Sequence, residues 1–393
     1  MELAFRNQPA DSLEMKSRFF KVVKCSVAAV LICNGAIHRA GASDPPVVLQ
    51  PFLQPPPALA SQMGKFRSPL LFDDGTRVTR AEDWPRRRNE ILKNWHGSMG
   101  AWPPLLEKPG MKALREERRE NFTQRRVSLE VAPGQSQEGW LLLPDGAGPF
   151  PAVLVVYYEP ETGAGLVPGE KGAQRDYALQ LVRCGFVVLS IGSPGGNAWK
   201  PETGKAVCQP LSFHAYVAAN VWSAMAALPQ VDSKRIGVVG HSYGGKWALF
   251  AAALWERFAA VAVSDPGIVW DEARSNVNYW EPWYLGQDTA LKEQRKPGVP
   301  TEQNPRTGSY ARLVADGRDL TDLHALICPR PFLVSGGAED QPERWTALNH
   351  SRAVNDLLGF KDRVAMTSRP AHTPDEAANV VVRAFFEHYL KSP

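Results

Sequence analysis

Short, near-continuous apolar runs recur along this 393-residue chain and constrain its fold more than any other feature. They occupy residues 152–158, 186–191, 236–239, 259–263 and 332–335. Strands of a parallel sheet are covered by helices on both faces, so they read as continuous rather than alternating apolar runs. Segments with helical periodicity lie between and after these runs, at residues 174–183, 215–228, 246–255, 344–358 and 374–389. The chain is therefore predicted to be an α/β protein with a doubly wound, mostly parallel sheet.

Both ends of this pattern, and one break within it, carry further information. Residues 127–131 and 140–143 predict a leading β-hairpin, and residues 364–366 predict a last short strand. The alternation stops over residues 267–321, a stretch too long for an ordinary connection in a compact domain. We expect this insertion to form a lid over the carboxyl edge of the sheet.

The N-terminus has the features of a secretory signal peptide. Basic residues between positions 16 and 24 precede an apolar run over residues 25–37, which ends at the small residues Ala40-Gly41-Ala42. That run is about 13 residues long, whereas a membrane-spanning helix needs about 20. We therefore expect residues 1–42 to be removed on export, leaving a secreted or periplasmic protein without stable membrane insertion.

Two segments are expected between the signal peptide and the catalytic domain. Residues 43–62 are rich in proline and predict an extended linker. Residues 63–125 predict a helical extension, because Trp84, Ile91 and Trp95 recur with helical spacing between charged residues. The catalytic domain would then span residues 126–393 and include the lid at about residues 267–321.

Charge and cysteine content exclude several classes of function. The 45 basic and 41 acidic residues are interleaved, so the chain has no basic stripe of the kind that binds nucleic acid. No CxxC or HxH cluster indicates a metal site, and no cofactor is predicted. Once residues 1–42 are removed, Cys184, Cys208 and Cys328 remain, so at most one disulfide could form.

Ser242 is the strongest candidate for a catalytic residue. The apolar run at residues 236–239 leads into Gly240-His241-Ser242-Tyr243-Gly244, and a helical pattern follows. In this strand–turn–helix context a serine oxygen projects from a sharp turn, and the flanking glycines avoid collisions. The Tyr243 amide would begin the helix and could stabilise an oxyanion, with a second amide from Tyr158 or Glu159. The motif thus predicts a serine hydrolase that forms an acyl-enzyme on Ser242.

A serine nucleophile needs a base and an acid, expected in the chain order Ser, acid, His. His372 follows the last predicted strand, and of the eight histidines it alone fits this position. Asp340 is our choice for the acid, because it follows the run at residues 332–335 after a Gly-x-x-Asp spacing. Glu339 is its nearest rival. Asp265, which ends the preceding strand, is the alternative that could reach the same histidine.

Several motifs resemble bacterial glucuronoyl esterases, a carbohydrate esterase family of the α/β-hydrolase superfamily. They are Phe72-Asp73-Asp74-Gly75-Thr76 with Trp84-Pro85-Arg86-Arg87-Arg88-Asn89-Glu90-Ile91-Leu92, Ser242-x-x-Gly245-Lys246, and Asp322-x-His324-x-Leu326-Ile327-x-Pro329-Arg330-Pro331. The resemblance implies an α/β-hydrolase fold, triad positions for Ser242, His372 and either Asp340 or Asp265, and contact of Lys246 with sugar hydroxyls. The family usually has arginine directly after its nucleophile, where this chain has Tyr243.

The expected lid contains an aromatic cluster that bears on the substrate. Trp280 and Trp283 could stack on sugar rings, or they could fill the core of the lid, which is the usual place for tryptophan. Together with the resemblance, this favours an exported serine esterase that acts on a small-molecule ester or on an ester of a carbohydrate or plant polysaccharide.

Two alternatives stay open at this point. The turn His-Ser-Tyr-Gly-Gly is also similar to that of acetyl xylan esterases, dienelactone hydrolases and serine peptidases of the same superfamily. The other alternative is a non-catalytic binding module on the same scaffold, which the complete order of serine, acid and histidine disfavours.

Overall fold

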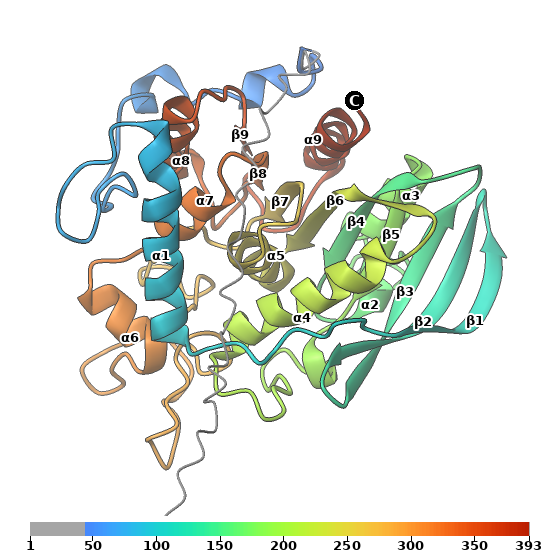
Figure 1. The fold of residues 1–393 in the computed structure, drawn as a ribbon, viewed down its shortest axis with the longest axis horizontal. Helices are drawn as coiled ribbons and strands as arrows, with labels where there is room; N and C mark the ends of the chain where they lie inside the picture. The colour runs from blue at the N-terminus through green and yellow to red at the C-terminus, as the bar shows by residue number, and fades with distance from the viewer. Residues whose placement is uncertain (1–43, 393) are drawn as a thin grey trace, which may run out of the picture. The chain divides into compact units, whose positions relative to one another are not determined.

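A single mixed sheet forms the centre of the protein (Figure 1). The computed structural model describes residues 44–392, and the predicted signal peptide lies outside them. The strand order is β1-β2-β3-β5-β4-β6-β7-β8-β9. The strands are β1 (Met111–Arg119), β2 (Phe122–Ala132), β3 (Gln135–Pro144), β4 (Phe150–Val156), β5 (Val187–Ile191), β6 (Val231–His241), β7 (Ala260–Ser264), β8 (Phe332–Ser335) and β9 (Val364–Thr367).

The sheet is antiparallel at one end and parallel over the rest. β1, β2, β3 and β5 pair in antiparallel fashion, and β2 with β3 forms the predicted hairpin. From β5 through β4 to β9 every neighbouring pair is parallel. The register pairs His241 with Ser264, Ser264 with Ser335, and Ser335 with Thr367. The residues that follow these four strand ends therefore lie side by side at one edge of the sheet.

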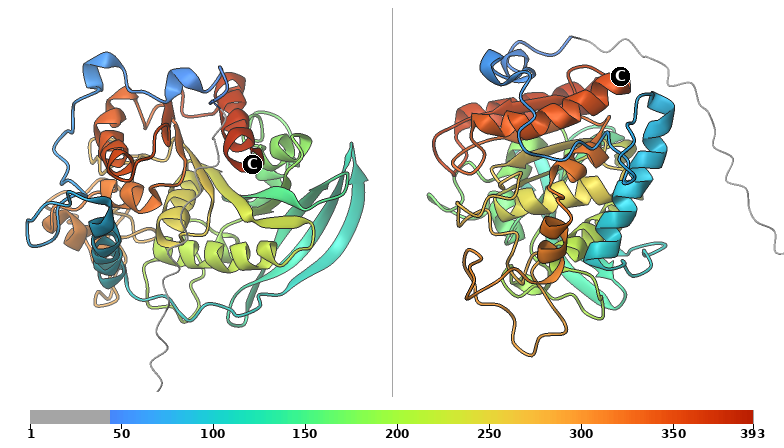
Figure 2. Two further views of the ribbon diagram at one scale, coloured as in Figure 1. Left: turned by 45° about the horizontal axis from the view of Figure 1, so that its top comes forward. Right: turned by 90° about the vertical axis from the view of Figure 1, so that its left-hand side faces the viewer.

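Helices cover both faces of the sheet, which explains the continuous apolar runs (Figures 1 and 2). The helices are α1 (Trp84–Met99), α2 (Pro160–Gly163), α3 (Tyr177–Arg183), α4 (Pro210–Ala226), α5 (Tyr243–Leu254), α6 (Gly308–Ala315), α7 (Thr321–Ile327), α8 (Trp345–Leu357) and α9 (Glu376–Phe386). Along β4, Leu154 joins the apolar cluster of α4 and α5, while Val153 and Val155 join the cluster of α3 and α9. The predicted doubly wound α/β architecture is confirmed.

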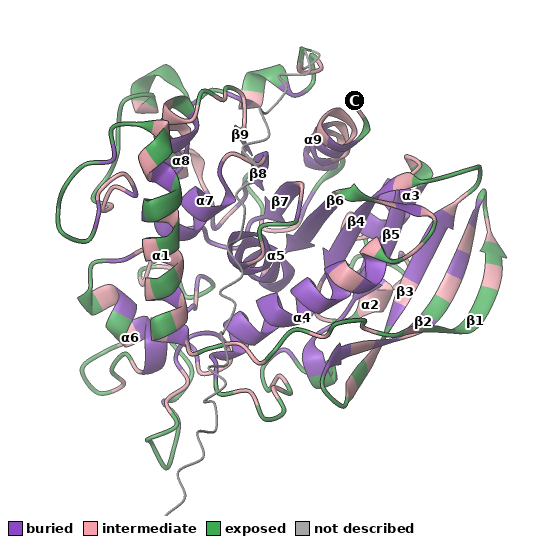
Figure 3. Cartoon of the chain, in the orientation of Figure 1, coloured by how far each residue is buried: buried purple, intermediate pink, exposed green. Residues whose placement is uncertain are grey.

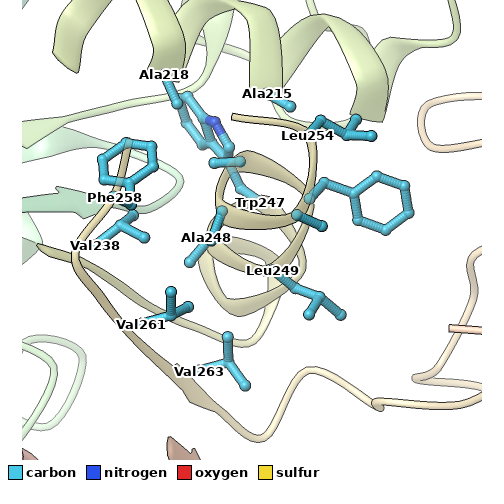
Figure 4. Packing of buried hydrophobic residues seen from close by; sticks show 14 of the residues in the cluster. Ala215, Ala218, Val238, Trp247, Ala248, Leu249, Leu254, Phe258, Val261 and Val263 are labelled. Atoms are coloured by element: carbon cyan, nitrogen blue, oxygen red, sulfur yellow. The ribbon is translucent and has the colours of Figure 1, made fainter. Parts of the chain in front are cut away.

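The helix α5, which follows Ser242, is buried along its whole length. All of its residues from Tyr243 to Leu254 are buried, and it packs between α4 and the sheet (Figures 3 and 4). Trp247 points toward α4, where its Nε1 donates a 2.6 Å hydrogen bond to His214 O. A helix with no solvent-facing side must be apolar all round, and the sequence from Trp247 to Leu254 meets this requirement.

Two expectations for the N-terminal region are wrong. Residues 43–62 are not an extended linker, because residues 44–62 carry two short 3-10 turns, Leu49 and Leu53 are buried, and Asn349 Nδ2 donates to Leu59 O at 2.8 Å. Residues 63–125 are not helical throughout, because β1 lies within them. β1 is an edge strand that is mostly charged, so its sequence has no clear alternation of apolar and polar residues. Its pairing with β2 brings Glu116 within 2.5 Å of Arg125. The formation of such a strand depends on pairing with its neighbour and not on the hydrophobic pattern of its own sequence.

The helix α1 attaches to the rest of the protein through the first of the family-like motifs. Its Trp95 Nε1 donates to Asp322 Oδ2 on α7 at 3.0 Å. Asp73 accepts from Arg87 Nη1 at 3.0 Å and from Arg318 Nη2 at 3.1 Å. Burial alone would raise the pKa of Asp73, but hydrogen bonds from Asn94, Arg87 and Arg318 lower it to about 2. We therefore assign this motif a structural role, because its ion pairs attach α1 to the segment that contains Arg318.

The insertion expected at about residues 267–321 connects β7 to β8. Most of it is irregular, and its aromatic residues Tyr279, Trp280 and Tyr284 are buried. The helices α6 and α7 end it and pack against α1. Within residues 44–392, no helix is long and apolar enough to cross a membrane.

Candidate active site

Ser242 lies in the sharp turn between β6 and α5 that the motif predicts. Its backbone has φ +55° and ψ −117°, a conformation that costs about 1–3 kcal/mol and needs support from its surroundings. Tight packing provides that support, since a Cβ on Gly240 would lie 2.2 Å from Gly244 O and one on Gly244 would lie 2.0 Å from Val156 O. The Ser242 N–H also donates to Ser264 O at 2.8 Å. The two glycines are thus required by close approach of the backbone.

His372 completes a continuous chain of hydrogen-bonding groups. It lies in the loop between β9 and α9, and its Nε2 is 2.9 Å from Ser242 Oγ. Its Nδ1 is 2.7 Å from Asp265 Oδ2. The His372 side chain is 34% exposed, whereas Asp265 is fully buried behind it. Serine, imidazole and carboxylate therefore meet at the carboxyl edge of the sheet in the geometry that a serine hydrolase requires.

Asp265 is held by peptide groups of the loop after β8. Its Oδ1 accepts the N–H of Glu339 at 3.0 Å and that of Asp340 at 2.8 Å. Asp265 itself has φ +52°, in the left-handed region of backbone conformation. A Cβ on Gly337 would lie 2.7 Å from Asp265 Oδ2, so a glycine at that position makes room for the carboxylate.

The expectation that Asp340 contacts His372 is corrected by this geometry. The Asp340 carboxylate instead accepts the N–H groups of Gly267, at 2.9 Å, and Ile268, at 2.7 Å. Burial, together with the nearby Asp265, raises the pKa of Asp340 to about 6. The physical reason is that the loop after β8 directs the peptide N–H groups of Glu339 and Asp340 toward Asp265, while the Asp340 side chain points to the N–H groups of Gly267 and Ile268.

Glu339, the rival acid, also lies away from the imidazole. Arg274 Nε and Asn276 Nδ2 each donate to its carboxylate at 3.1 Å. Both donors belong to the insertion between β7 and β8. Glu339 therefore connects the insertion to the sheet edge.

The groups expected to hold an oxyanion lie beside Ser242. Tyr243 is the first residue of α5, where N–H groups have no partner within the helix. On the β4 side, the Tyr157 N–H is occupied by Ile191 O at 3.2 Å, which leaves Tyr158 and Glu159 as the candidates. Burial raises the pKa of the Tyr158 hydroxyl, and a hydrogen bond with the Ser242 side chain partly offsets this. The Tyr158 side chain thus lies beside that of Ser242.

The Tyr243 side chain, directly after the nucleophile, is buried in the core. It is 1% exposed, and its hydroxyl is hydrogen-bonded to Nε2 of His214. Burial lowers the pKa of His214 to about 4, so this imidazole stays neutral near pH 7. The residue after the nucleophile therefore packs the core, and only its backbone N–H can serve the reaction.

Of the three residues expected to bind substrate, two are buried. Trp280 is fully buried and packs against Tyr310 with ring centroids 6.0 Å apart, so of the two roles expected for it, it fills the core of the insertion and does not stack on a sugar. Trp283 is half-buried. Lys246 is 3% exposed, and its Nζ lies 3.3 Å from Asn276 O. Burial lowers the pKa of Lys246 to about 8.

Two residues near the site have no counterpart in the sequence predictions. Trp199, in the loop after β5, is 62% exposed and stacks on Tyr158 with ring centroids 5.3 Å apart. A large aromatic residue within a loop rich in glycine and lysine is the signal that could have identified it.

Arg369, near the end of β9, is buried beside His372 and is connected to it by a 2.7 Å hydrogen bond to His372 O.

Within the described part of the chain, no group of three or more His, Cys, Asp or Glu residues is placed to hold a metal ion. Cys184, Cys208 and Cys328 are free, so no disulfide links the described residues.

Comparison with known proteins agrees with this architecture. A family model for the prolyl oligopeptidase family matches residues 212–304, and no curated protein matches the chain in sequence. A glucuronoyl esterase from Solibacter usitatus is similar in structure, with 19% identity and a TM-score of 0.62 over 82% of this chain and 97% of that one.

Two further esterases are similar in structure. A glucuronoyl esterase from Teredinibacter turnerae has 21% identity and a TM-score of 0.59 over 82% of this chain and 88% of that one. A putative acetyl xylan esterase from Bacteroides fragilis has 17% identity and a TM-score of 0.52 over 79% and 86%. At these identities the likeness concerns the fold, and it shows that the chain has the α/β-hydrolase fold.

Proposed function

We propose that the protein is a serine carboxylic-ester hydrolase that forms an acyl-enzyme on Ser242. The observation that carries this proposal is the continuous contact from Ser242 Oγ to His372 Nε2, at 2.9 Å, and from His372 Nδ1 to Asp265 Oδ2, at 2.7 Å. A serine hydroxyl is a weak nucleophile without such a base, and the base needs a carboxylate to fix its tautomer. This arrangement also argues against a non-catalytic binding module.

In the first half of the reaction, Ser242 Oγ attacks the ester carbonyl carbon as its proton moves to His372 Nε2. The carbonyl oxygen becomes an oxyanion, for which the Tyr243 N–H and either the Tyr158 or the Glu159 N–H are the proposed donors. The Tyr158 hydroxyl, which lies beside Ser242, is proposed as a further donor. Collapse of the intermediate breaks the bond to the alcohol, which takes the proton from His372 and leaves.

In the second half, water attacks the acyl group and gives a proton to His372. The bond between the acyl carbon and Ser242 Oγ breaks, Oγ takes that proton back, and a carboxylic acid is released. Asp265 orients the imidazole and stabilises the imidazolium that forms in each half. The hydrogen bonds to Asp265 from the Glu339 and Asp340 N–H groups suit it to this role.

A carbohydrate ester is the proposed substrate class. The similar structures named as glucuronoyl and acetyl xylan esterases cover 82% and 79% of this chain. Trp199 supports the same class, because an exposed aromatic face beside a nucleophile offers a flat apolar surface to the ring of a substrate. Trp283, the half-buried tryptophan of the insertion, is proposed as a second contact for the substrate.

A serine peptidase is the second candidate, favoured by the prolyl oligopeptidase match over residues 212–304. That segment contains Ser242 and Asp265 but neither His372 nor the strands β1 to β5. Ester and peptide hydrolysis use the same triad, so only substrates can separate the two activities.

Export is proposed from the basic residues, the apolar run and Ala40-Gly41-Ala42 near the N-terminus. Protein isolated from its host is then expected to begin at Ser43. Recovery of the intact N-terminus from cytoplasmic protein would contradict export without bearing on catalysis.

The test of function is hydrolysis by the purified protein of a panel of acetylated xylo-oligosaccharides, methyl glucuronate esters and aminoacyl amides. The expected result is hydrolysis of at least one carbohydrate ester and no hydrolysis of the amides, with all activity absent from Ser242→Ala. Cleavage of the amides with higher kcat/KM than the esters would favour the peptidase. A folded protein that hydrolyses no ester or amide would overturn the assignment of an enzyme.

A further inference from the structure

Arg369 is a buried arginine whose charge is not neutralised by a carboxylate. It is 5% exposed, and no ion pair among residues 44–392 includes it. Its guanidinium instead donates to oxygen atoms at the carboxyl edge of the sheet. These acceptors are Ser335 O at 2.9 Å, Ser335 Oγ and Gly336 O at 3.1 Å, Ser264 Oγ at 3.2 Å, His372 O at 2.7 Å and Thr373 O at 2.9 Å. Burial of a cation is costly unless its donors are satisfied, and here they are.

The acceptors belong to the segments that carry the proposed acid and base. Ser264 directly precedes Asp265 at the end of β7, and Ser335 ends β8 beside it. One guanidinium nitrogen, Nη2, donates both to Ser264 Oγ and to His372 O. A planar, rigid group therefore connects the backbone of His372 to the residue before Asp265. The Arg369 N–H adds a 3.2 Å hydrogen bond to Gly336 O, which holds the start of the same loop.

The His372 loop has few other restraints on this side. Arg175 Nη2 donates to Thr373 Oγ1 at 2.8 Å, and the imidazole itself reaches Asp265 and Ser242. An error of about 1 Å in the position of a catalytic group can cost about 100-fold in rate. The position of the His372 backbone is thus decisive for proton transfer from Ser242.

We infer that Arg369 is a positioning residue that fixes His372 between Asp265 and Ser242 by fastening the His372 carbonyl to the ends of β7 and β8. This inference rests on the proposed serine-hydrolase function. Arg369 touches no reacting atom in this scheme, and lysine cannot replace it, because a single ammonium cannot reach acceptors on three segments at once.

The chain offers a matched control in Arg330, another buried arginine that donates to backbone carbonyls. Its acceptors are Ala252 O at 2.8 Å, Leu326 O and Ile327 O at 3.0 Å, Phe258 O at 3.1 Å and Trp255 O at 3.4 Å. Arg330 lies just before β8, at the opposite edge of the sheet from Ser242. Arg330→Lys therefore removes the same kind of bonding without touching the His372 loop.

The experiment compares Arg369→Lys with Arg330→Lys in the full chain, with kcat and KM on an activated ester and the melting temperature of each. Arg369→Lys is expected to lose about 100-fold in kcat with KM within about threefold of wild type. Arg330→Lys is expected to stay within about threefold in kcat even if its melting temperature falls further. Added guanidinium ion at non-denaturing concentration is expected to restore part of the activity of Arg369→Ala.

A readout that does not depend on turnover separates this inference from the proposed function. The low-field proton resonance of the hydrogen bond between His372 Nδ1 and Asp265 is expected in wild type and Arg330→Lys and absent from Arg369→Lys. If wild type hydrolyses no substrate, this resonance still reports on positioning. Wild-type kcat in folded Arg369→Lys, or equal losses in both variants, would overturn the inference. If neither Arg369→Lys nor Arg369→Gln folds while Arg330→Lys does, Arg369 is a folding determinant and the inference is also overturned.

Discussion

Asp265 lies 2.7 Å from His372, although the insertion and two strands separate these residues in the sequence. The contact arises because β7, β8 and β9 are neighbours in register, so the residue after β7 faces the loop after β9 across the end of β8. The loop after β8 lies between them and contributes the N–H groups of Glu339 and Asp340 to the carboxylate. The proposed acid therefore precedes the insertion, while its hydrogen-bond donors follow it.

Asp265→Asn is expected to lower kcat by about 10⁴, because an amide in place of the carboxylate holds the imidazole in the wrong tautomer and cannot stabilise the imidazolium. The melting temperature should change little, since the amide oxygen can still accept the N–H groups of Glu339 and Asp340. The measurement is kcat on an activated ester alongside thermal unfolding. Turnover within tenfold of wild type would remove Asp265 from the acid role.

Asp340→Asn is the matched control for that substitution. Its carboxylate contacts the Gly267 and Ile268 N–H groups, and its link to Asp265 is through its own peptide N–H, which the substitution leaves in place. We expect kcat within about tenfold of wild type for the folded variant, since the donor to Asp265 is unchanged. Kinetic losses equal to those of Asp265→Asn would instead mean that the histidine depends on both carboxylates.

Ser242→Ala is expected to lose about 10⁶ in turnover, as serine hydrolases do when the nucleophile is removed. The variant should fold normally, because close packing at Gly240 and Gly244 imposes the turn and the serine hydroxyl contributes no core contact. Circular dichroism and hydrolysis of an activated ester check the two expectations. Residual activity near that of wild type would show that another residue is the nucleophile.

Trp199→Ala is expected to raise KM for a carbohydrate ester by about tenfold with the melting temperature unchanged, because the side chain is 62% exposed and stacks only on Tyr158. Trp280→Ala provides the contrast. It is fully buried, so its removal should destabilise the fold by about 3–5 kcal/mol and leave KM of the folded protein nearly unchanged. Steady-state kinetics on carbohydrate and simple alkyl esters, with thermal unfolding, test both; equal KM for Trp199→Ala and wild type would contradict a substrate contact.

Asp319 predicts a pH dependence of stability. Burial raises its pKa to about 7, although its carboxylate accepts the Leu320 N–H at 2.6 Å and the Trp270 N–H at 3.1 Å. Asp322 raises this pKa further and Arg344 lowers it. The unfolded chain releases the proton near pH 4 and the folded protein only near pH 7, so stability present below pH 4 is lost as the pH rises to about 7.

Asp319→Asn cannot ionise, so its melting temperature is expected to rise relative to wild type as the pH increases from 4 to 7. Asp340, whose pKa is raised to about 6, titrates in the same window in both proteins and cancels in the difference. Thermal unfolding of the two proteins at several pH values makes the comparison. A constant difference across the window would show that Asp319 does not titrate there.

The sequence by itself determined the features that depend on local physics. A parallel strand buried on both faces must be continuously apolar, so the sequences of β4 to β8 indicate strands. In β4, Leu154 packs on one face of the sheet and Val153 and Val155 pack on the other, so all three positions must be apolar. The sharp turn at Ser242 requires glycines on both sides and a helix after it. The motif therefore indicates both the turn and the serine at its apex. His372 follows from chain order, because it alone lies in the loop directly after the last strand, whereas His388 lies beyond the final helix α9.

Only the tertiary structure decided which carboxylate meets His372, which tryptophan is exposed and how the N-terminal segments pack. Asp265 and Asp340 each follow a parallel strand, and the choice between them depends on Gly337, which admits the Asp265 side chain, and on peptide N–H groups turned toward it. Trp199 and Trp280 differ only in what covers them, and β1 exists because β2 pairs with it. These outcomes depend on contacts between residues far apart in the chain, which neither periodicity nor spacing records.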